Sequence, residues 1–396
     1  MTHFIWLYFE FSVTAFVGCL VVLMLINWRL LRRIDRAPSP HSFPRVSVLI
    51  PARNEEANIG ECVRSLLAQD YDDFEVIVLN DRSTDRTADI LAELQEEAAA
   101  AHDKAGRPRL RVLEGQELPE GWLGKHWACH QLGAHADGEL LLFTDADTRH
   151  GSQSLRHGVG AMQAADADML TAFPHEIVVT WAEKLVVPVF PFSIFSFLPL
   201  IVAYRVQSPA FSAAIGQYMI FRRAAYQQIG GYMAIRDRPV DDVALAQRIK
   251  AHGLRWRLAD ATRDVRCRMY RNAGEVFEGF SKNLFAGFGY RLLPFAFVWT
   301  WLAIVFLMPI TILLLWSVGA GVPTLDAAIA GAGVVFGFTL WGLSHLRFRF
   351  PLWLALLYPI SMLLALVIAV RSVVLAVRGR STWKGRTLIR PQIRWW

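Results

Sequence analysis

The sequence predicts an α/β protein with a mostly parallel sheet and with transmembrane helices at both ends of the chain. Three observations predict this. Of the 396 residues, 54% are hydrophobic, and the excess over an ordinary soluble protein lies near the N-terminus and after about residue 295. Short apolar runs alternate with helical patterns between residues 45 and 174. Polar residues follow directly after several of these runs.

The first element is an apolar segment from Phe4 to Ile26, which is long enough to cross a bilayer as a helix. Arg29, Arg32 and Arg33 follow it, and basic residues mark the cytoplasmic end of a span. A basic region before the segment and a small-residue cleavage site after it are both missing from the sequence. We therefore expect residues 1–30 to be an anchor and not a signal peptide.

The middle of the chain alternates between two kinds of pattern. Apolar runs predict strands at residues 46–50, 74–79, 110–113, 140–144 and 169–173. Helical spacing of apolar residues predicts helices at 56–69, 87–97, 125–136 and 152–164. Such alternation is typical of a parallel sheet covered on both faces, which binds ligands beyond the carboxyl ends of its strands.

Two carboxylates follow the strand predicted at 140–144. Alternate residues at a strand end share a face, so Asp145 and Asp147 can converge on one cation while Ala146 points away. Mg²⁺ and Mn²⁺ take oxygen ligands and usually share them with substrate phosphates. The sequence therefore predicts a divalent metal site in an enzyme that handles a nucleotide diphosphate.

Polar residues also follow the first two predicted strands. Arg53 and Glu55 come after the first, although the acids there would also suit the first turn of a helix. Asp81 follows the second and suits a hydrogen bond to a ribose hydroxyl or a base N–H. Ser83 either caps the next helix or contacts the same ligand.

The phosphate-binding signatures of dinucleotide and P-loop enzymes, Gly-x-Gly-x-x-Gly and Gly-x-x-x-x-Gly-Lys-Ser/Thr, are missing from the sequence. Lys125, which follows Gly124 where a helix is predicted to begin, either contacts a phosphate or lies on the surface.

The segment at 184–204 is apolar but contains three prolines, so a straight span is disfavoured. We expect it to lie at the membrane interface beside a site that a lipid substrate enters, or to be buried core. Further on, Asp241 and Asp242 open an amphipathic helix. Acids suit a helix N-terminus, but the interval after the metal motif favours Asp242 as a catalytic base, with Asp241 as a capping partner.

The ordered set of motifs resembles family 2 inverting glycosyltransferases of the GT-A fold. The residues that carry this resemblance are Pro51, Asn54, Glu55, Asn80, Asp81, Ser83, Asp85, Asp145, Asp147, Asp241 and Asp242. A narrower resemblance, to membrane enzymes that glycosylate carotenoids (the diaponeurosporenoate type) and to a hopanoid-associated group, rests on the sequence at residues 121–128, 281–283 and 383–386.

The resemblance implies a Rossmann-like GT-A domain at 45–290 and inverting transfer of a hexose from a UDP-sugar to a membrane lipid. Asp145 and Asp147 would hold the nucleotide through Mg²⁺ or Mn²⁺, and Asp242 would take the proton from the acceptor. The residues expected to bind the nucleotide sugar are Pro51, Arg53, Glu55, Asp81, Ser83, Lys125, Asp145, Gln217, Trp383 and Arg386.

Two features depart from the family pattern. The usual Glu-Asp pair is Asp241-Asp242, and the Gln-x-x-Arg-Trp signature of processive synthases is missing because His252 stands three residues before Arg255. The second departure disfavours polymer synthesis. Trp383 and Arg386 would instead supply the contacts to the diphosphate, which requires a cytoplasmic tail.

Three further apolar stretches, at 297–318, 327–343 and 352–370, predict a C-terminal membrane region at 295–377 and a basic tail at 378–396. If all three cross the membrane, the tail ends outside, whereas its basic residues favour the inside. We expect a multi-pass protein of the cell (inner) membrane, a cytoplasmic catalytic domain and tail, and one re-entrant or interfacial stretch. The net charge of +6 lies beside membrane segments and favours anionic lipids, with no nucleic-acid partner expected.

Three other functions remain open. A membrane carrier or channel would explain the apolar ends but not the carboxylates at strand ends. A non-catalytic nucleotide-sugar-binding membrane protein would need no base. A polyprenyl-phosphate sugar transferase would use the same donor site with a different lipid.

Overall fold

The computed structural model describes residues 2–103, 105–379, 382–383, 386–387 and 392–396. Its contacts divide the chain into two units. The sheet unit contains Leu31–Ile177 and Leu200–Met269, and the helical unit contains Met1–Leu30, Val178–Pro199 and Tyr270–Trp396. This division differs from the predicted limits of 45–290, because residues 178–199 and 270–290 form apolar helices that pack within the helical unit.

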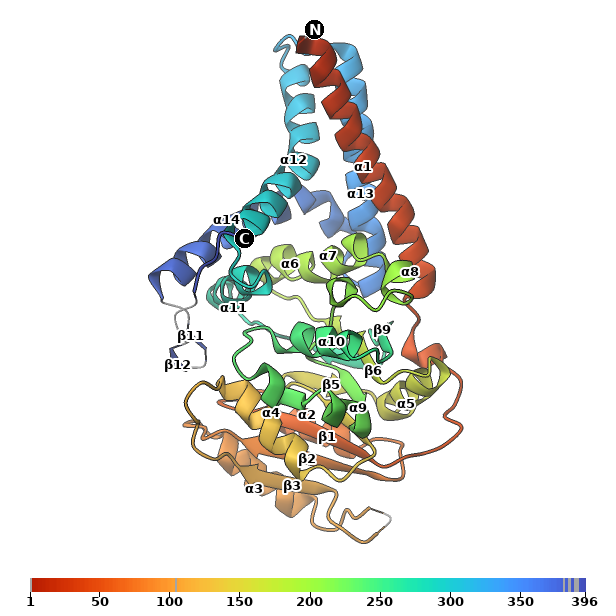
Figure 1. Ribbon diagram of the computed structural model, residues 1–396, viewed down its shortest axis with the longest axis vertical. Coiled ribbons are helices and arrows are strands. Elements are labelled where there is room, and N and C mark those ends of the chain that lie inside the picture. Colours follow the sequence, from red (N-terminus) through yellow and green to blue (C-terminus); the bar gives the residue numbers. More distant parts are fainter. Residues whose placement is uncertain (1, 104, 380–381, 384–385, 388–391) are drawn as a thin grey trace. The chain divides into compact units, whose positions relative to one another are not determined.

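In the described part of the sheet unit, seven strands form one sheet in the order β3-β2-β1-β4-β8-β6-β9 (Figure 1). All neighbours are parallel except β8, which is antiparallel to β4 and β6. The predicted α/β fold with a mostly parallel sheet is confirmed. The strands are β1 Val46–Ala52, β2 Phe74–Asn80, β3 Leu110–Glu114, β4 Leu140–Phe143, β6 Met169–Phe173, β8 Met219–Arg222 and β9 Trp256–Asp260.

Apolar helices cover the sheet because its strands are apolar on both faces. Val48 and Ile50 of β1 belong to one buried cluster with Val63 and Leu94 of two covering helices. Leu49, between them, is buried against the opposite face, since successive strand residues point to opposite sides. The helices of this unit are α2 Ile59–Leu67, α3 Thr87–Glu97, α4 Gly124–His135, α5 Ser154–Ala164, α8 Leu200–Ala203, α9 Arg223–Gln228 and α10 Asp241–Ala251, with 3-10 turns η1 Ile34–Arg36, η2 Pro209–Phe211 and η3 Gly231–Ile235.

A second, three-stranded sheet lies within the same unit in the order β5-β10-β7. Its strands are β5 Thr148–His150, β7 His175–Glu176 and β10 Val265–Cys267. The pairing sets Cys267 opposite Thr148 on one side and opposite Glu176 on the other. These strands are too short for a periodic pattern, so the sequence does not predict them as a sheet.

The helical unit is built from long apolar helices. Within the described residues, four helices are long and apolar enough to cross a membrane. They overlap the four segments predicted from the sequence, and an η4 turn (Leu352–Leu357) leads into the last of them, which begins later than the predicted residue 352. Their bounds are α1 Thr2–Leu30, α12 Leu292–Ser317, α13 Thr324–Phe348 and α14 Tyr358–Arg378.

Shorter helices complete this unit. The proline-containing stretch near 184–204 is divided into α6 Trp181–Val186, α7 Val189–Phe197 and α8, so it does not form a straight span. A reciprocal pair of hydrogen bonds between Thr180 and Glu183 begins α6. Helix α11 (Ala273–Gly287) packs on α14, and β11 (Thr382–Trp383) pairs with β12 (Arg386–Thr387) in a hairpin.

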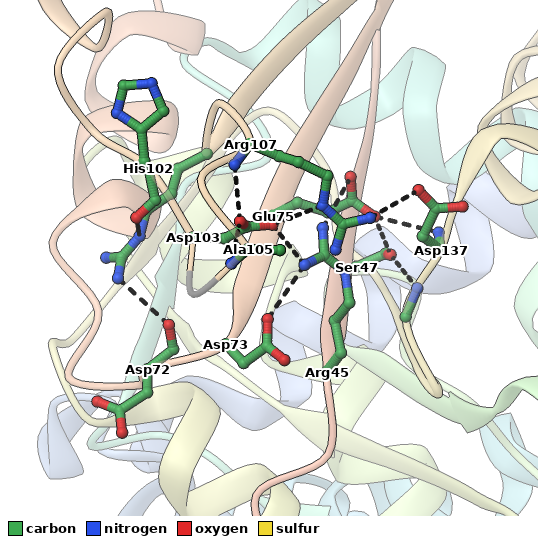
Figure 2. Close-up of polar contacts among 12 residues, drawn as sticks. Arg45, Ser47, Asp72, Asp73, Glu75, His102, Asp103, Ala105, Arg107 and Asp137 are labelled. Atoms are coloured by element: carbon green, nitrogen blue, oxygen red, sulfur yellow. Dashed lines mark hydrogen bonds and ion pairs between the residues drawn. The ribbon is translucent and has the colours of Figure 1, made fainter.

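A buried charge network lies where β1 begins (Figure 2). The Arg45 guanidinium lies 3.1 Å from Asp73, 2.5 Å from Asp103 and 3.6 Å from Glu75. Glu75 also accepts hydrogen bonds from Ser47 at 2.6 Å and from Arg111 at 2.9 Å. Burial opposes ionisation of Glu75 and Asp103, but these donors outweigh it and lower the pKa of both carboxyls.

We expect Arg45→Met to destabilise the fold by about 3–5 kcal/mol, because it leaves buried carboxylates without their cation. Thermal unfolding of the purified protein in detergent measures this. The carboxyl pKa values are lowered in the folded state, so the stabilisation is present above about pH 4 and is lost as the pH falls further. The difference between variant and wild type should therefore shrink in acid.

Arg64→Met is the matched control, since the ion pair of Arg64 with Glu97 spans 2.7 Å but both side chains are about half exposed. Its loss should cost less than about 1 kcal/mol. Equal destabilisation by the two variants would contradict a special role for the buried network.

Candidate active site

The carboxyl ends of β1 and β2 meet at one edge of the large sheet, as predicted. Arg53 donates from its guanidinium to the backbone carbonyls of Asp81 at 2.6 Å and of Arg82 at 3.1 Å. The backbone N–H of Asp81 donates in turn to the carbonyl of Ala52 at 2.7 Å. Asp81 is buried at this edge. The structure thus brings together two residues that the sequence assigned to the nucleotide sugar.

Hydrogen bonds join the loops that follow these two strands. The Ser83 hydroxyl accepts from the backbone N–H of Asn54 at 3.0 Å, and the Thr87 hydroxyl accepts from that of Glu55 at 2.8 Å. Helix α2 begins at Ile59 and not at residue 56, because the backbone of residues 54–56 bonds to the neighbouring loop. Ser83 therefore does not cap α3, and the acids at 55–56 do not form the first turn of α2.

Lys125 connects two of the predicted acids. It lies in the first turn of α4, with its Nζ 2.7 Å from Asp145 and 3.6 Å from Asp241. Burial would lower the pKa of Lys125, but the charges of Asp145 and Asp241 outweigh burial and hold that pKa well above its usual value. The alternative of a surface lysine is therefore wrong. Tyr232 also donates to Asp241, at 3.1 Å.

Asp242 lies on the other side of the same space. One of its oxygens accepts from the backbone N–H of Gly216 at 3.1 Å, and the other accepts from that of Val243 at 2.7 Å. A Cβ at Gly216 would lie 3.6 Å from Lys125 Nζ and 3.7 Å from both Asp145 Oδ2 and Asp242 Oδ2. Three predicted side chains therefore surround one glycine. Burial, and then the charge of Asp241, raise the pKa of Asp242 to about 7.

Asp147 follows Asp145 into β5 and differs from it in its surroundings. Its Oδ1 is buried and has no hydrogen-bond partner in the described part of the chain. Burial, then Asp145, then Glu55 raise the pKa of Asp147 to about 7. The Cys267 thiol lies against the carboxyl groups of Asp147 and Glu176, and one oxygen of Glu176 is likewise buried without a partner among the described residues.

These residues fit a divalent cation that is shared with a substrate. Among the described residues, no group of three or more His, Cys, Asp or Glu side chains is arranged to hold a metal ion. A cation such as Mg²⁺, however, is usually held by one or two carboxylates together with substrate phosphates. The carboxylates of Asp145 and Asp147 offer oxygen ligands to such an ion. The buried Asp147 Oδ1, which has no partner among the described residues, would gain one when the ion binds.

Sequence reasoning missed several residues around these acids. Thr144, Thr148 and His150 contact the turn that carries Asp145, and Glu176 and Cys267 lie beside Asp147. Glu176, like the predicted residues, follows closely after a strand, β6, and this position could have identified it from the sequence. Cys267 lies in a three-residue strand far along the chain, where periodicity gives no signal.

The other residues that the sequence assigned to the nucleotide sugar are Pro51, Gln217, Trp383 and Arg386. Pro51 is in β1, and the backbone carbonyl of Gln217 accepts from the Thr144 hydroxyl at 2.7 Å, just before β8. Trp383 and Arg386 pair with each other in the hairpin of the helical unit. The side chains of Trp383 and Arg386 lie outside the described part of the chain.

Part of the chain is similar to known proteins. Residues 47–230 match the model of glycosyl transferase family 2. A β-monoglucosyldiacylglycerol synthase from Nostoc sp. is 37% identical over 124 residues, which is 31% of this chain and 24% of that protein. A 4,4'-diaponeurosporenoate glycosyltransferase from Staphylococcus aureus is 26% identical over 252 residues, 62% of each chain. The matches thus span less than two thirds of these relatives.

The fold is also found in a solved structure. The mannosyltransferase PcManGT from Pyrobaculum calidifontis, in complex with GDP-Man and Mn²⁺, superposes with a TM-score of 0.50. It is 18% identical, over 92% of this chain and 98% of that one. At that identity the likeness concerns the fold, and it agrees with the predicted GT-A architecture.

Proposed function

We propose that this chain, a glycosyltransferase whose residues 47–230 form a family 2 domain, transfers a hexose from a UDP-sugar to a membrane lipid with inversion. The convergence of Lys125, Asp145 and Asp242 on Gly216 carries the proposal. It sets a cation, a candidate metal ligand and a candidate base around one small space. The names of the two relatives, which concern diacylglycerol and diaponeurosporenoate, support a lipid acceptor.

The donor would bind along the carboxyl edge of the sheet. The Asp81 carboxylate would accept a hydrogen bond from the ribose or the base, and the cross-linked loops carrying Arg53, Glu55 and Ser83 would line the nucleotide. Lys125, which forms an ion pair with Asp145, would form a second ion pair with the diphosphate. Mg²⁺ or Mn²⁺ held by Asp145 and Asp147 would neutralise the charge that develops on the leaving diphosphate.

The acceptor would be activated on the opposite side of the sugar. Asp242 would take the proton of the acceptor hydroxyl or carboxyl group while that oxygen attacks the anomeric carbon. Its pKa of about 7 suits a general base near neutral pH. The backbone N–H groups of Gly216 and Val243 orient the carboxylate for this step.

The helical unit would hold the enzyme in the membrane. We place the long helices α1, α12, α13 and α14 in the cell (inner) membrane of the source, on the strength of their length and apolar composition. Arg29, Arg32 and Arg33 at the end of α1 favour a cytoplasmic sheet unit. A cytoplasmic tail, which the basic residues at 378–396 favour, would require one of the three C-terminal stretches to be re-entrant or interfacial.

Transfer of radiolabel from UDP-glucose into organic-extractable lipid tests the proposal. Purified membranes containing the protein, with Mn²⁺ or Mg²⁺, should yield labelled lipid that membranes without the protein do not, and mass analysis would identify the acceptor. Labelled product that is destroyed by mild acid would indicate a polyprenyl phosphate acceptor instead. Failure to transfer from UDP-hexoses and from GDP-mannose alike would contradict the proposed reaction.

A further inference from the structure

A buried polar cluster lies beneath the turn that carries Asp145 and Asp147. It consists of Thr144, Thr148, His150, Ser154 and Gln69, and each of them is at most 6% exposed. None of these residues has a role in the mechanism proposed above. Polar groups buried to this degree must satisfy one another, so their hydrogen bonds can be assigned one by one.

The two threonine hydroxyls each donate to a backbone carbonyl. Thr148 Oγ1 donates to the carbonyl of Asp145 at 2.8 Å, and Thr144 Oγ1 donates to the carbonyl of Gln217 at 2.7 Å. Both hydroxyl oxygens also lie 3.1 Å from His150 Nε2 and 3.0 Å from each other. His150 Nε2 therefore contacts both hydroxyls.

The other side of the ring faces a third hydroxyl. His150 Nδ1 lies 3.2 Å from the oxygen of Ser154, which donates its own hydrogen to Gln69 Oε1 at 2.9 Å. Gln69 is fixed beside Ser154, because both hydrogens of its amide nitrogen go to carbonyls, of Ser65 at 3.0 Å and of Gly151 at 2.8 Å. Burial also lowers the pKa of His150 to about 3, so the ring is neutral at physiological pH.

We propose that His150, whose Nε2 contacts two buried threonine hydroxyls, is a positioning residue for the nucleotide-sugar site, an inference that rests on the proposed function. Through Thr148 it holds the carbonyl of Asp145, and through Thr144 it holds that of Gln217. One imidazole nitrogen thus links the two segments that form the site.

The link extends to the candidate base. Gly216 precedes Gln217, and its backbone N–H holds Asp242 at 3.1 Å. The ends of β4 and β8 are paired, with Phe143 opposite Met219, so a shift on either side of the cluster changes the separation of Asp145 from Asp242. Loss of Nε2 on His150 would leave two buried threonine hydroxyls without this polar contact and would loosen both segments.

The test compares His150→Phe, which keeps a ring but removes its nitrogens, with His150→Gln, whose side-chain amide can hydrogen-bond to the threonine hydroxyls from a similar distance. The probe is UDP with Mn²⁺, titrated calorimetrically into the full-length protein in detergent. We expect His150→Phe to weaken UDP binding about 10- to 100-fold, and His150→Gln to recover most of this loss. Thermal unfolding, measured in parallel, gives the folded fraction.

A second pair of variants keeps the test decisive if His150→Phe does not fold. Thr144→Val preserves shape but removes the hydroxyl, and Thr144→Ser retains it, so only the valine variant should bind UDP more weakly. The positioning role is overturned if folded His150→Phe or Thr144→Val binds UDP as wild type does, or if the glutamine and serine variants are no better than their partners. Wild-type protein that binds neither UDP nor GDP with Mn²⁺ would overturn the proposed function itself, and the positioning role with it.

Discussion

Asp242→Asn should lower turnover about 10²- to 10⁴-fold, the usual contribution of a positioned general base, while UDP binding changes little. The asparagine has nearly the same shape and can still accept a hydrogen bond from Gly216 or Val243, so the local structure should persist. What it loses is the ability to take a proton. Steady-state transfer of labelled sugar gives the turnover, and UDP titration gives the binding.

The pH profile provides a second measure of the same residue. A base must be ionised to act, and the pKa of Asp242 is raised to about 7. The ratio kcat/KM, which reports the free enzyme, should therefore fall about tenfold for each pH unit below about 7 in the wild type. The Asp242→Asn variant should lack this acidic limb.

Asp241→Asn is the matched control, because Asp241 is adjacent in sequence but bonds to Tyr232 and lies near Lys125. Its loss should weaken donor binding through Lys125 and affect turnover less than Asp242→Asn does. If Asp241→Asn abolished turnover while Asp242→Asn remained active, the base would be Asp241.

Asp147→Asn should remove most of the metal-dependent part of UDP binding. The buried Oδ1 of Asp147 has no partner among the described residues, and an amide is a much poorer ligand for Mg²⁺ or Mn²⁺ than a carboxylate. We expect the Mn²⁺-dependent gain in UDP affinity to fall at least tenfold, of the order expected for loss of a metal contact. UDP binding in EDTA should be unchanged, and a loss there would show that Asp147 does not act through a cation.

The same substitution should stabilise the metal-free protein at alkaline pH. The pKa of Asp147 is about 7 in the folded state and about 4 when exposed, so between these values the folded state binds the proton more tightly. Stability of the wild type therefore falls as the pH rises through this window, and the deficit is largest above about pH 7. Asparagine carries no charge, so metal-free Asp147→Asn should melt above wild type at pH 8 and near it at pH 4.

Much of the fold could be predicted because its signals are local. The strand at 169–173 and the helix at 87–97 have the predicted limits, since apolar spacing alone fixes them. Helix α2 begins later than predicted, because the backbone of residues 54–56 bonds to a loop about 30 residues away. The periodic spacing of apolar residues gives no information about hydrogen bonds to that loop.

The sequence by itself determined which residues stand at strand ends, and parallel strands place those ends at one edge of a sheet. Arg53, Asp81 and Asp145 were found in this way. Only the tertiary structure decided what each side chain contacts: the pairing of Lys125 with Asp145, the thiol of Cys267 beside Asp147, and the contact of His150 with Thr144. These depend on contacts between segments far apart in the chain, where burial and exact separation, and not local pattern, set the energy.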